Sequence, residues 1–140
     1  MQKRIHKIQG ISLGTASSNT RYGKKEDSLL VTLPQESILS GKFTSNKLKA
    51  APVKLAIEHL SNSKKAKKVL LINAGNANAA TGPKGLNDVR KYCKEIALDF
   101  KIGQENVIPF STGVIGEPLA IESYLNAFRE ASKSLSENKW

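Results

Sequence analysis

The sequence contains a continuous apolar run at residues 69–72, and this run limits the folds that the chain can adopt. An uninterrupted apolar segment of this kind is typical of a strand covered on both faces. The following segment, up to Phe100, contains one apolar stripe at helical spacing, formed by Leu86, Val89, Cys93, Ile96, Ala97 and Phe100. A buried strand followed by an amphipathic helix predicts an α+β domain in which helices pack on a sheet.

Two further strands and a helix are expected before this run. Residues 28–33 are apolar and partly β-branched, which predicts a strand. Residues 41–46 are expected to form a second, shorter strand. A helix is expected to begin near Pro52 and to end at residues 61–63, and residues 64–68 form a basic connector to the buried strand.

The remaining elements follow the long helix, which Gly103 is expected to stop. Residues 107–110 predict a short strand, and residues 111–116 predict a glycine-rich turn. Pro118 is expected to open a last helix that buries Ile121, Tyr124, Leu125, Phe128, Ala131 and Leu135. This helix is expected to run almost to Trp140 without a clear cap, so we expect the chain to be incomplete at its C-terminal end.

Length and composition exclude several classes of protein. The 140 residues are 39% apolar and 24% charged, which excludes a disordered chain and suits a single domain segment spanning residues 1–140. No stretch approaches the ~18–20 apolar residues of a membrane span, and no secretory signal is visible. The single cysteine excludes an internal disulfide and a cysteine-based zinc site and suits a reducing compartment. We therefore expect a cytoplasmic protein without membrane contact.

The net charge of +10 is confined to one half of the chain. Residues 1–70 hold 14 basic and 4 acidic groups, whereas residues 71–140 hold 8 of each. A basic half indicates either a nucleic-acid or acidic partner or a solvated surface. Because lysine greatly outnumbers arginine and only 6% of residues are aromatic, the sequence favours the solvated surface.

Residues 73–82 place three asparagines among small residues directly after the buried strand. One interpretation is a turn in which the asparagine side chains satisfy backbone groups. The other is a polar wall of a binding cleft at the end of a strand, because asparagine offers donors and an acceptor without charge.

Residues 110–118 also allow two interpretations. A strand, a glycine-rich turn and a helix start expose backbone N–H groups that can stabilise an oxyanion in acyl transfer. The alternative is a structural turn with Gly113 or Gly116 at positive φ. The segment lacks the Gly-Lys-Ser/Thr ending of a phosphate-binding loop, which argues against ATP binding.

Conventional catalytic groups are scarce. His6 lies in a charged terminus, His59 is expected on a helix surface, and Cys93 lies on the apolar stripe and is expected in the core. No cluster of histidines and carboxylates has the spacing of a metal site. The sequence therefore offers candidate binding and oxyanion elements without a nucleophile and its base.

Two stretches resemble the N-terminal, α-chain part of the ornithine acetyltransferase family, the bifunctional glutamate N-acetyltransferases of arginine biosynthesis. They are residues 73–82, Asn-Ala-Gly-Asn-Ala-Asn-Ala-Ala-Thr-Gly, and residues 111–119, Ser-Thr-Gly-Val-Ile-Gly-Glu-Pro-Leu. Residues 41–46 together with 49–53 resemble a third stretch, and the whole resemblance covers about residues 10–140. It implies the layered αββα sandwich of the DmpA/ArgJ-like type.

The resemblance also implies a mechanism. Family members cut themselves into an α and a β chain, which assemble as a heterotetramer of two α and two β chains. The new N-terminal threonine of the β chain takes acetyl from N2-acetylornithine and passes it to glutamate. Such a nucleophile can use its own α-amine as base. The matching pair Thr112 and Gly113 would form the oxyanion hole. No metal and no bound cofactor are implied, and acetyl-CoA is an alternative acetyl donor.

The sequence departs from the family pattern in one respect. It ends before the Thr-Thr-Asp and Lys-Gly stretches that carry substrate contacts and before the cleavage junction. We therefore expect the 140 residues to be inactive alone and to need the β chain as a partner. The alternatives are part of a related self-processing aminopeptidase or amidase, and a basic nucleic-acid-binding module.

Overall fold

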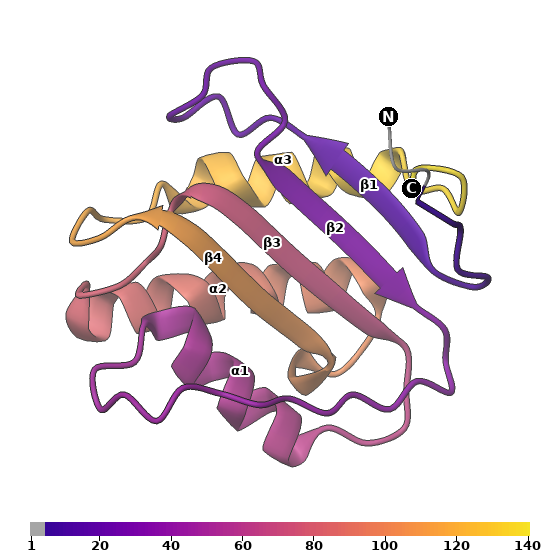
Figure 1. Ribbon diagram of the computed structural model, residues 1–140, viewed down its shortest axis with the longest axis horizontal. Helices are drawn as coiled ribbons and strands as arrows, with labels where there is room; N and C mark the ends of the chain where they lie inside the picture. Colours follow the sequence, from indigo (N-terminus) through magenta and orange to yellow (C-terminus); the bar gives the residue numbers. More distant parts are fainter. Residues whose placement is uncertain (1–4) are drawn as a thin grey trace.

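The computed structural model describes residues 5–140, which form a mixed four-stranded sheet and three α-helices (Figure 1). The strands lie in the order β1 (Ser12–Ala16), β2 (Ser28–Leu33), β3 (Lys68–Asn76) and β4 (Val107–Val114). β2 is antiparallel to both β1 and β3, whereas β3 and β4 are parallel. The helices are α1 (Ala51–Asn62), α2 (Gly82–Phe100) and α3 (Ile121–Lys133), and a 3-10 turn at Gln104–Asn106 precedes β4.

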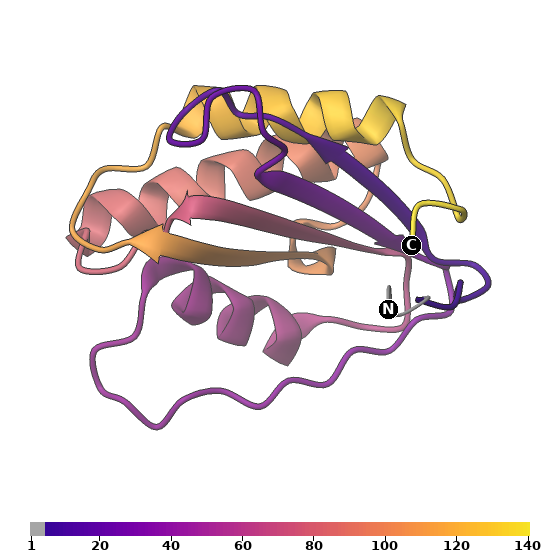
Figure 2. The same ribbon diagram turned by 45° about the horizontal axis from the view of Figure 1, so that its top comes forward.

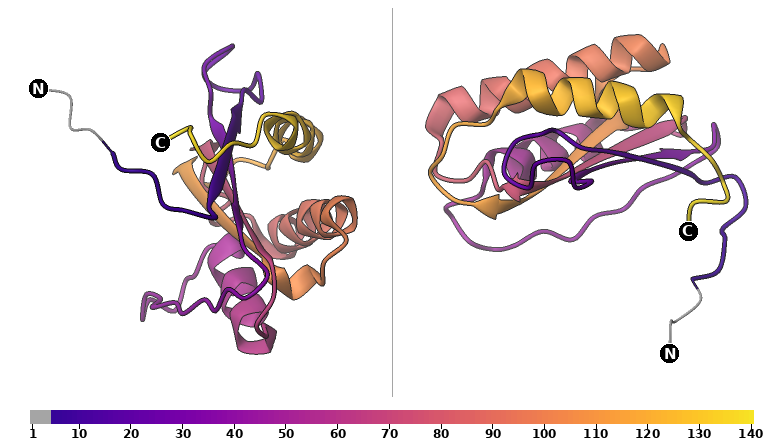
Figure 3. Two further views of the ribbon diagram at one scale, coloured as in Figure 1. Left: turned by 90° about the vertical axis from the view of Figure 1, so that its right-hand side faces the viewer. Right: turned by 90° about the horizontal axis from the view of Figure 1, so that it is seen from above.

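The helices α2 and α3 lie side by side on one face of the sheet, and α1 lies along the edge strand β4 (Figures 2 and 3). The helix α2 is the crossover that two adjacent parallel strands require, and it connects β3 to β4. The core fills the space between this face and the two helices. It is formed mainly by Leu30, Val69, Leu71 and Val107 of the sheet, Val89, Tyr92 and Ile96 of α2, and Tyr124, Leu125 and Phe128 of α3.

The opposite face of the sheet is also apolar but is less completely covered. Successive strand residues point to opposite faces, so Leu70, Ile72, Ile108 and Phe110 lie on the face away from α2 and α3. Ile108 is buried, Leu70 and Ile72 are half-buried, and Phe110 is 46% exposed. The expectation that residues 69–72 are covered on both faces is therefore met in full only on the helix side.

Several predicted elements are confirmed. The strand predicted at residues 28–33 is β2, and the helix expected near Pro52 is α1, with this proline in its first turn. In the predicted apolar stripe of α2, Val89, Cys93, Ile96 and Ala97 are buried, and Leu86 and Phe100 are partly buried against the core. The α+β fold class is confirmed by the mixed sheet and its packed helices.

One predicted strand is absent, and two helices end at other residues than predicted. Residues 41–46 form no strand but an exposed connection from β2 to α1, because no neighbouring strand is available to pair with them. The helix α2 ends before Gly103, at Phe100, where Lys101 adopts the left-handed conformation with φ of 54°. The last helix ends at Lys133 and not near Trp140, because the chain turns back and Ser136 forms two backbone hydrogen bonds with Leu13 of β1, both 3.0 Å.

Two basic side chains expected at the surface are buried. His59 is 4% exposed, and its Nδ1 lies 2.7 Å from the Val107 carbonyl oxygen, so it ties α1 to the edge of β4. Lys68, the last residue of the predicted connector, is the first residue of β3 and is fully buried. Its Nζ donates to Ser63 Oγ and Asn106 Oδ1, both at 2.6 Å, and to the carbonyl of Lys64.

Candidate functional site

The two segments that carry the resemblance lie side by side at the carboxyl ends of β3 and β4. The parallel register pairs Asn73 with Ser111, Ala74 with Thr112 and Gly75 with Gly113. Both strands therefore continue through segments that the sequence predicted as turns. In open sheets with parallel strands, the carboxyl ends of the strands are the usual position of a ligand site.

Gly113 allows the two strands to approach closely at this end. Its φ is +133°, which side-chain-bearing residues rarely adopt, and a Cβ at this position would lie 2.3 Å from the carbonyl carbon of Gly75. Gly116 has a positive φ of 84°. The sequence predicted a positive φ at Gly113 or Gly116, and both glycines have one. The backbone at Gly113 is thus held in one geometry by its neighbour on β3.

The backbone N–H of Gly113 lies on the outer edge of the sheet. The Val107 carbonyl points outward to His59 on α1, whereas the Val114 carbonyl accepts from Ala77 N–H on the β3 side. Backbone groups alternate in direction along a strand, so the N–H of Gly113 is on the outer side, like the Val107 carbonyl. It is therefore available to a ligand.

The Thr112 side chain lies next to this N–H on the less covered face of the sheet. Strand alternation places Thr112 on the same face as Ile108 and Phe110. Thr112 and Gly113 are both exposed. A hydroxyl and an adjacent backbone N–H can together bind one oxygen atom, which is the arrangement that an oxyanion hole requires.

The side chains of the three asparagines in residues 73–82 form hydrogen bonds within the protein. Asn73 Nδ2 donates to the Asn76 carbonyl at 2.8 Å, and its Oδ1 accepts from Ser111 Oγ at 2.6 Å. Asn76 Oδ1 accepts from Asn78 N–H at 2.7 Å, and Asn78 Nδ2 donates to the Gly85 carbonyl at 2.9 Å. All three are buried and have partners on both amide atoms. They satisfy backbone groups as one interpretation predicted, but residues 73–76 belong to β3 and not to a turn.

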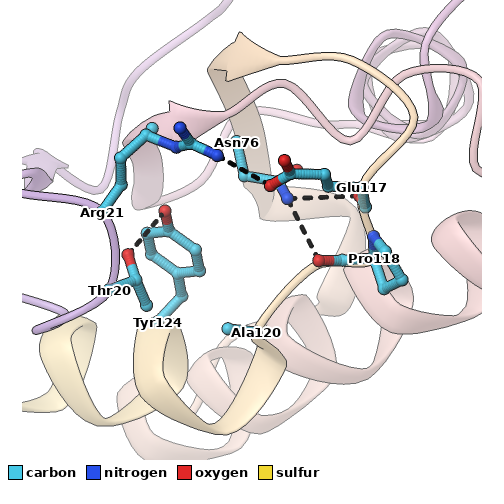
Figure 4. Close-up of a pocket in the computed structure, with 8 residues that line it drawn as sticks. Thr20, Arg21, Asn76, Glu117, Pro118, Ala120 and Tyr124 are labelled. Carbon is cyan, nitrogen blue, oxygen red and sulfur yellow. Dashed lines mark hydrogen bonds and ion pairs between the residues drawn. The ribbon is translucent and has the colours of Figure 1, made fainter.

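A polar cavity of about 390 Å³ lies beside the end of β3 (Figure 4). Arg21 and Glu117 form an ion pair of 2.8 Å across it. Tyr124 of α3 donates its hydroxyl to the Ala74 carbonyl at 2.9 Å and accepts from Thr20 at 3.3 Å. The cleft interpretation of residues 73–82 is met in part, because Gly75 and Asn76 line this cavity. Its other walls come from the β1–β2 connection, the segment after β4, and α3, and the sequence did not indicate that these segments meet.

No nucleophile with its base is present among residues 5–140. Burial raises the pKa of the Cys93 thiol well above its usual range, so this residue is a core thiol. Burial also raises the pKa of Tyr92, whose hydroxyl has no hydrogen-bond partner in the described structure. Within the same residues, no group of three or more His, Cys, Asp and Glu side chains could hold a metal ion.

The sequence profile of the ArgJ family matches residues 12–139. The chain belongs to the ArgJ family. The arginine biosynthesis bifunctional protein ArgJ of Methylococcus capsulatus is 42% identical over 137 residues, which are 98% of this chain and 33% of that protein. The protein of the same name from Pseudomonas fluorescens is 38% identical over 136 residues, which are 97% of this chain and 33% of that protein. This chain therefore spans about a third of the length of these ArgJ relatives.

Solved structures of ArgJ proteins have the same fold. The crystal structure of the arginine biosynthesis bifunctional protein from Bacillus halodurans superposes with a TM-score of 0.76 at 32% identity, covering 87% of this chain and 63% of that one. The structure of the ornithine acetyltransferase of Mycobacterium tuberculosis complexed with ornithine superposes with a TM-score of 0.84 at 24% identity. The match covers 93% of this chain and 69% of that one. The resemblance inferred from residues 73–82 and 111–119 is thus confirmed. No helix within residues 5–140 has the length and hydropathy to cross a membrane.

Proposed function

We propose that this chain is the part of an ArgJ-type acetyltransferase that provides the oxyanion hole. The complete enzyme would move acetyl from N2-acetylornithine to glutamate in arginine biosynthesis. The acetyl group would be carried in between by the N-terminal threonine of a self-cleaved β chain. Membership of the ArgJ family supports this proposal, as does the ornithine complex of the similar Mycobacterium tuberculosis structure.

The observation that carries the proposal is the pair of adjacent donors at the end of β4. When the threonine nucleophile attacks the acetyl carbonyl, the oxygen gains negative charge. The Thr112 hydroxyl and the Gly113 N–H would donate to this oxygen. The contact between Gly113 and Gly75 fixes the backbone before the reaction, so little reorganisation is needed as the charge develops.

The remaining chemistry would come from the β chain, because residues 5–140 contain no nucleophile paired with a base. The β-chain threonine would use its own α-amine as base. The half-covered sheet face around Phe110, next to Thr112, is an apolar surface on which the β chain would pack, as in an αββα sandwich. We expect a cytoplasmic heterotetramer of two α and two β chains, and no activity of this chain alone.

The acetyl group would arrive on the substrate, so the proposed reaction needs neither a metal nor a bound cofactor. Acetyl-CoA is an alternative donor, whose thioester oxygen would occupy the same oxyanion hole. The match to the ArgJ family favours acetyl transfer over the aminopeptidase or amidase alternative.

The test is acetyl transfer by the reassembled enzyme. This chain would be co-expressed with the remaining two thirds of an ArgJ relative, and acetyl transfer from N2-acetylornithine to glutamate would be measured. Thr112→Ala is expected to lower kcat about 100-fold or more, as for other oxyanion donors. Thr15→Ala, on β1 at the opposite edge of the sheet from β4, removes the same hydroxyl elsewhere and should leave kcat unchanged.

If the split enzyme does not assemble, the same two substitutions are made at the matching positions of a full-length relative. An unchanged kcat for the Thr112 variant would overturn the assignment of the oxyanion hole. Hydrolysis of peptides or simple amides without acetyl transfer would instead support the aminopeptidase or amidase alternative.

A further inference from the structure

A second cavity, of about 610 Å³, lies on the other side of the β4 end, where the first turns of α1 and α2 meet. The N-terminal ends of these two helices are neighbours in the fold (Figures 1 and 2). Its wall includes Ala79 and Ile115, which belong to the loops that follow β3 and β4, and the Gly116 N–H donates to the Ala79 carbonyl at 2.8 Å. The size suits a small organic ligand.

Three lysines line this cavity without an acidic partner. Lys47, Lys49 and Lys54 form no ion pair with any carboxylate of residues 5–140, and no acidic residue lines the cavity. Glu58, one turn beyond Lys54 on α1, is bound instead to Arg90 at 2.6 Å. Lysines placed together repel one another, so this arrangement is stabilised when an anion enters.

The two helix starts add to the same positive field. Neither α1 nor α2 has an acidic residue in its first turn or a side-chain cap at its N-terminus. The N-terminal end of each helix carries about half a positive charge from its aligned peptide dipoles. The lysines and the helix ends therefore act on the same cavity, which is open to solvent.

The cavity also has an exposed apolar wall. Leu48 is 89% exposed and Ile115 is 69% exposed, and Leu86 of α2 lies on the same lining. Large apolar side chains that line a cavity in this way favour a ligand with an apolar or ring portion beside its charge. No aromatic residue lines the cavity, so it offers no base-stacking platform for single-stranded nucleic acid.

From these features we propose that this cavity binds the phosphate or diphosphate group of a small organic molecule. Three cations and two helix ends match a multiply charged anion better than a single carboxylate. The lysines would bind the phosphate oxygens as point charges, while the organic portion would lie on Leu48 and Ile115. The proposal uses neither Thr112 nor Gly113, although Ala79 and Ile115 of the two stretches that carry the family resemblance line the cavity.

Binding would be measured by calorimetry on the 140-residue chain at low ionic strength, with inorganic pyrophosphate and ADP as probes. Lys49→Ala combined with Lys54→Ala is expected to weaken both affinities about tenfold or more, because two charge-assisted contacts are lost. The matched control is Lys24→Ala combined with Lys25→Ala, which removes the same charge from the exposed β1–β2 connection. This control should change either affinity less than about twofold. Thermal unfolding with and without ligand gives a second readout of binding.

Leu48→Ser distinguishes an inorganic phosphate ligand from an organic one. It is expected to weaken ADP binding several-fold and to leave pyrophosphate binding unchanged. If ADP binds no more tightly than pyrophosphate in the parent chain, the inference of an organic portion is wrong. The anion site itself is refuted if neither probe binds, or if the control pair weakens binding as much as the Lys49 and Lys54 pair does.

Discussion

The side chain of Asn76 connects the end of β3 to the loop at Asn78 and to the segment after β4. Asn76→Ala therefore tests what stabilises the candidate site. Its Nδ2 donates to the carbonyl oxygens of Glu117 at 3.2 Å and Pro118 at 3.1 Å. Its Oδ1 accepts from the N–H of Asn78 at 2.7 Å, and the residue is 7% exposed. These bonds hold the connection after β4, and with it the position of Gly113, against the end of β3.

The magnitude follows from the three hydrogen bonds that are lost. Each net hydrogen bond contributes about 1 kcal/mol to stability, and alanine leaves the partners at this buried position without a replacement. We expect the free energy of unfolding to fall by about 2–3 kcal/mol. With a urea dependence of about 2 kcal/mol per molar, the unfolding midpoint would fall by about 1–1.5 M.

Urea unfolding followed by circular dichroism measures this change. Asn46→Ala is the matched control, because Asn46 Oδ1 also accepts one backbone hydrogen bond, from Leu48 at 2.9 Å, but in an exposed segment. Its effect should stay below about 0.5 kcal/mol. A midpoint for Asn76→Ala within the error of the parent, or an equal loss in both variants, would refute the structural role assigned to the asparagines.

Two other buried groups give predictions of a different kind. Burial lowers the pKa of Lys68 below its ordinary value of 10.5 and outweighs the attraction of Glu105, so just below pH 10.5 the folded chain binds fewer protons than the unfolded chain. The free energy of unfolding of the parent should therefore rise, relative to that of Lys68→Met, as the pH is raised toward 10.5. Urea unfolding midpoints of both proteins at several pH values test this. A difference between the two midpoints that does not change with pH would contradict it. Because burial raises the pKa of the Cys93 thiol, iodoacetamide should label the folded chain about 100-fold more slowly than the chain in urea, and equal rates would show that Cys93 is accessible.

The elements predicted correctly are those whose pattern is local. β2 and the buried face of α2 follow from apolar residues at strand and helix spacing, and this spacing does not depend on distant partners. The first turn of α1 is likewise marked by Pro52. The Thr112–Gly113 pair was proposed from a long motif, which identifies the family even where the secondary structure of the segment was predicted incompletely; its role as an oxyanion hole stays a prediction.

The features that were missed depend on contacts between distant segments. His59 is buried only because α1 lies along β4, where the Val107 carbonyl needs a donor. The end of the last helix depends on Ser136 finding a partner in Leu13, more than a hundred residues earlier in the chain. The strand length of β3 and β4 follows from their pairing through Gly75 and Gly113, which no single segment reveals.

The basic excess of residues 1–70 has several structural roles. Lys68 is buried and bonded to three neutral acceptors, so it contributes to the connection between α1 and β3 and not to the surface. Arg21 is paired with Glu117 of the other half, across the cavity beside β3. The lysines at positions 47, 49 and 54 differ from both, because they gather around one cavity and lack an acidic partner within residues 5–140. A solvated surface explains dispersed lysines such as Lys24, whereas Lys47, Lys49 and Lys54 line one partly apolar cavity beside two helix N-termini.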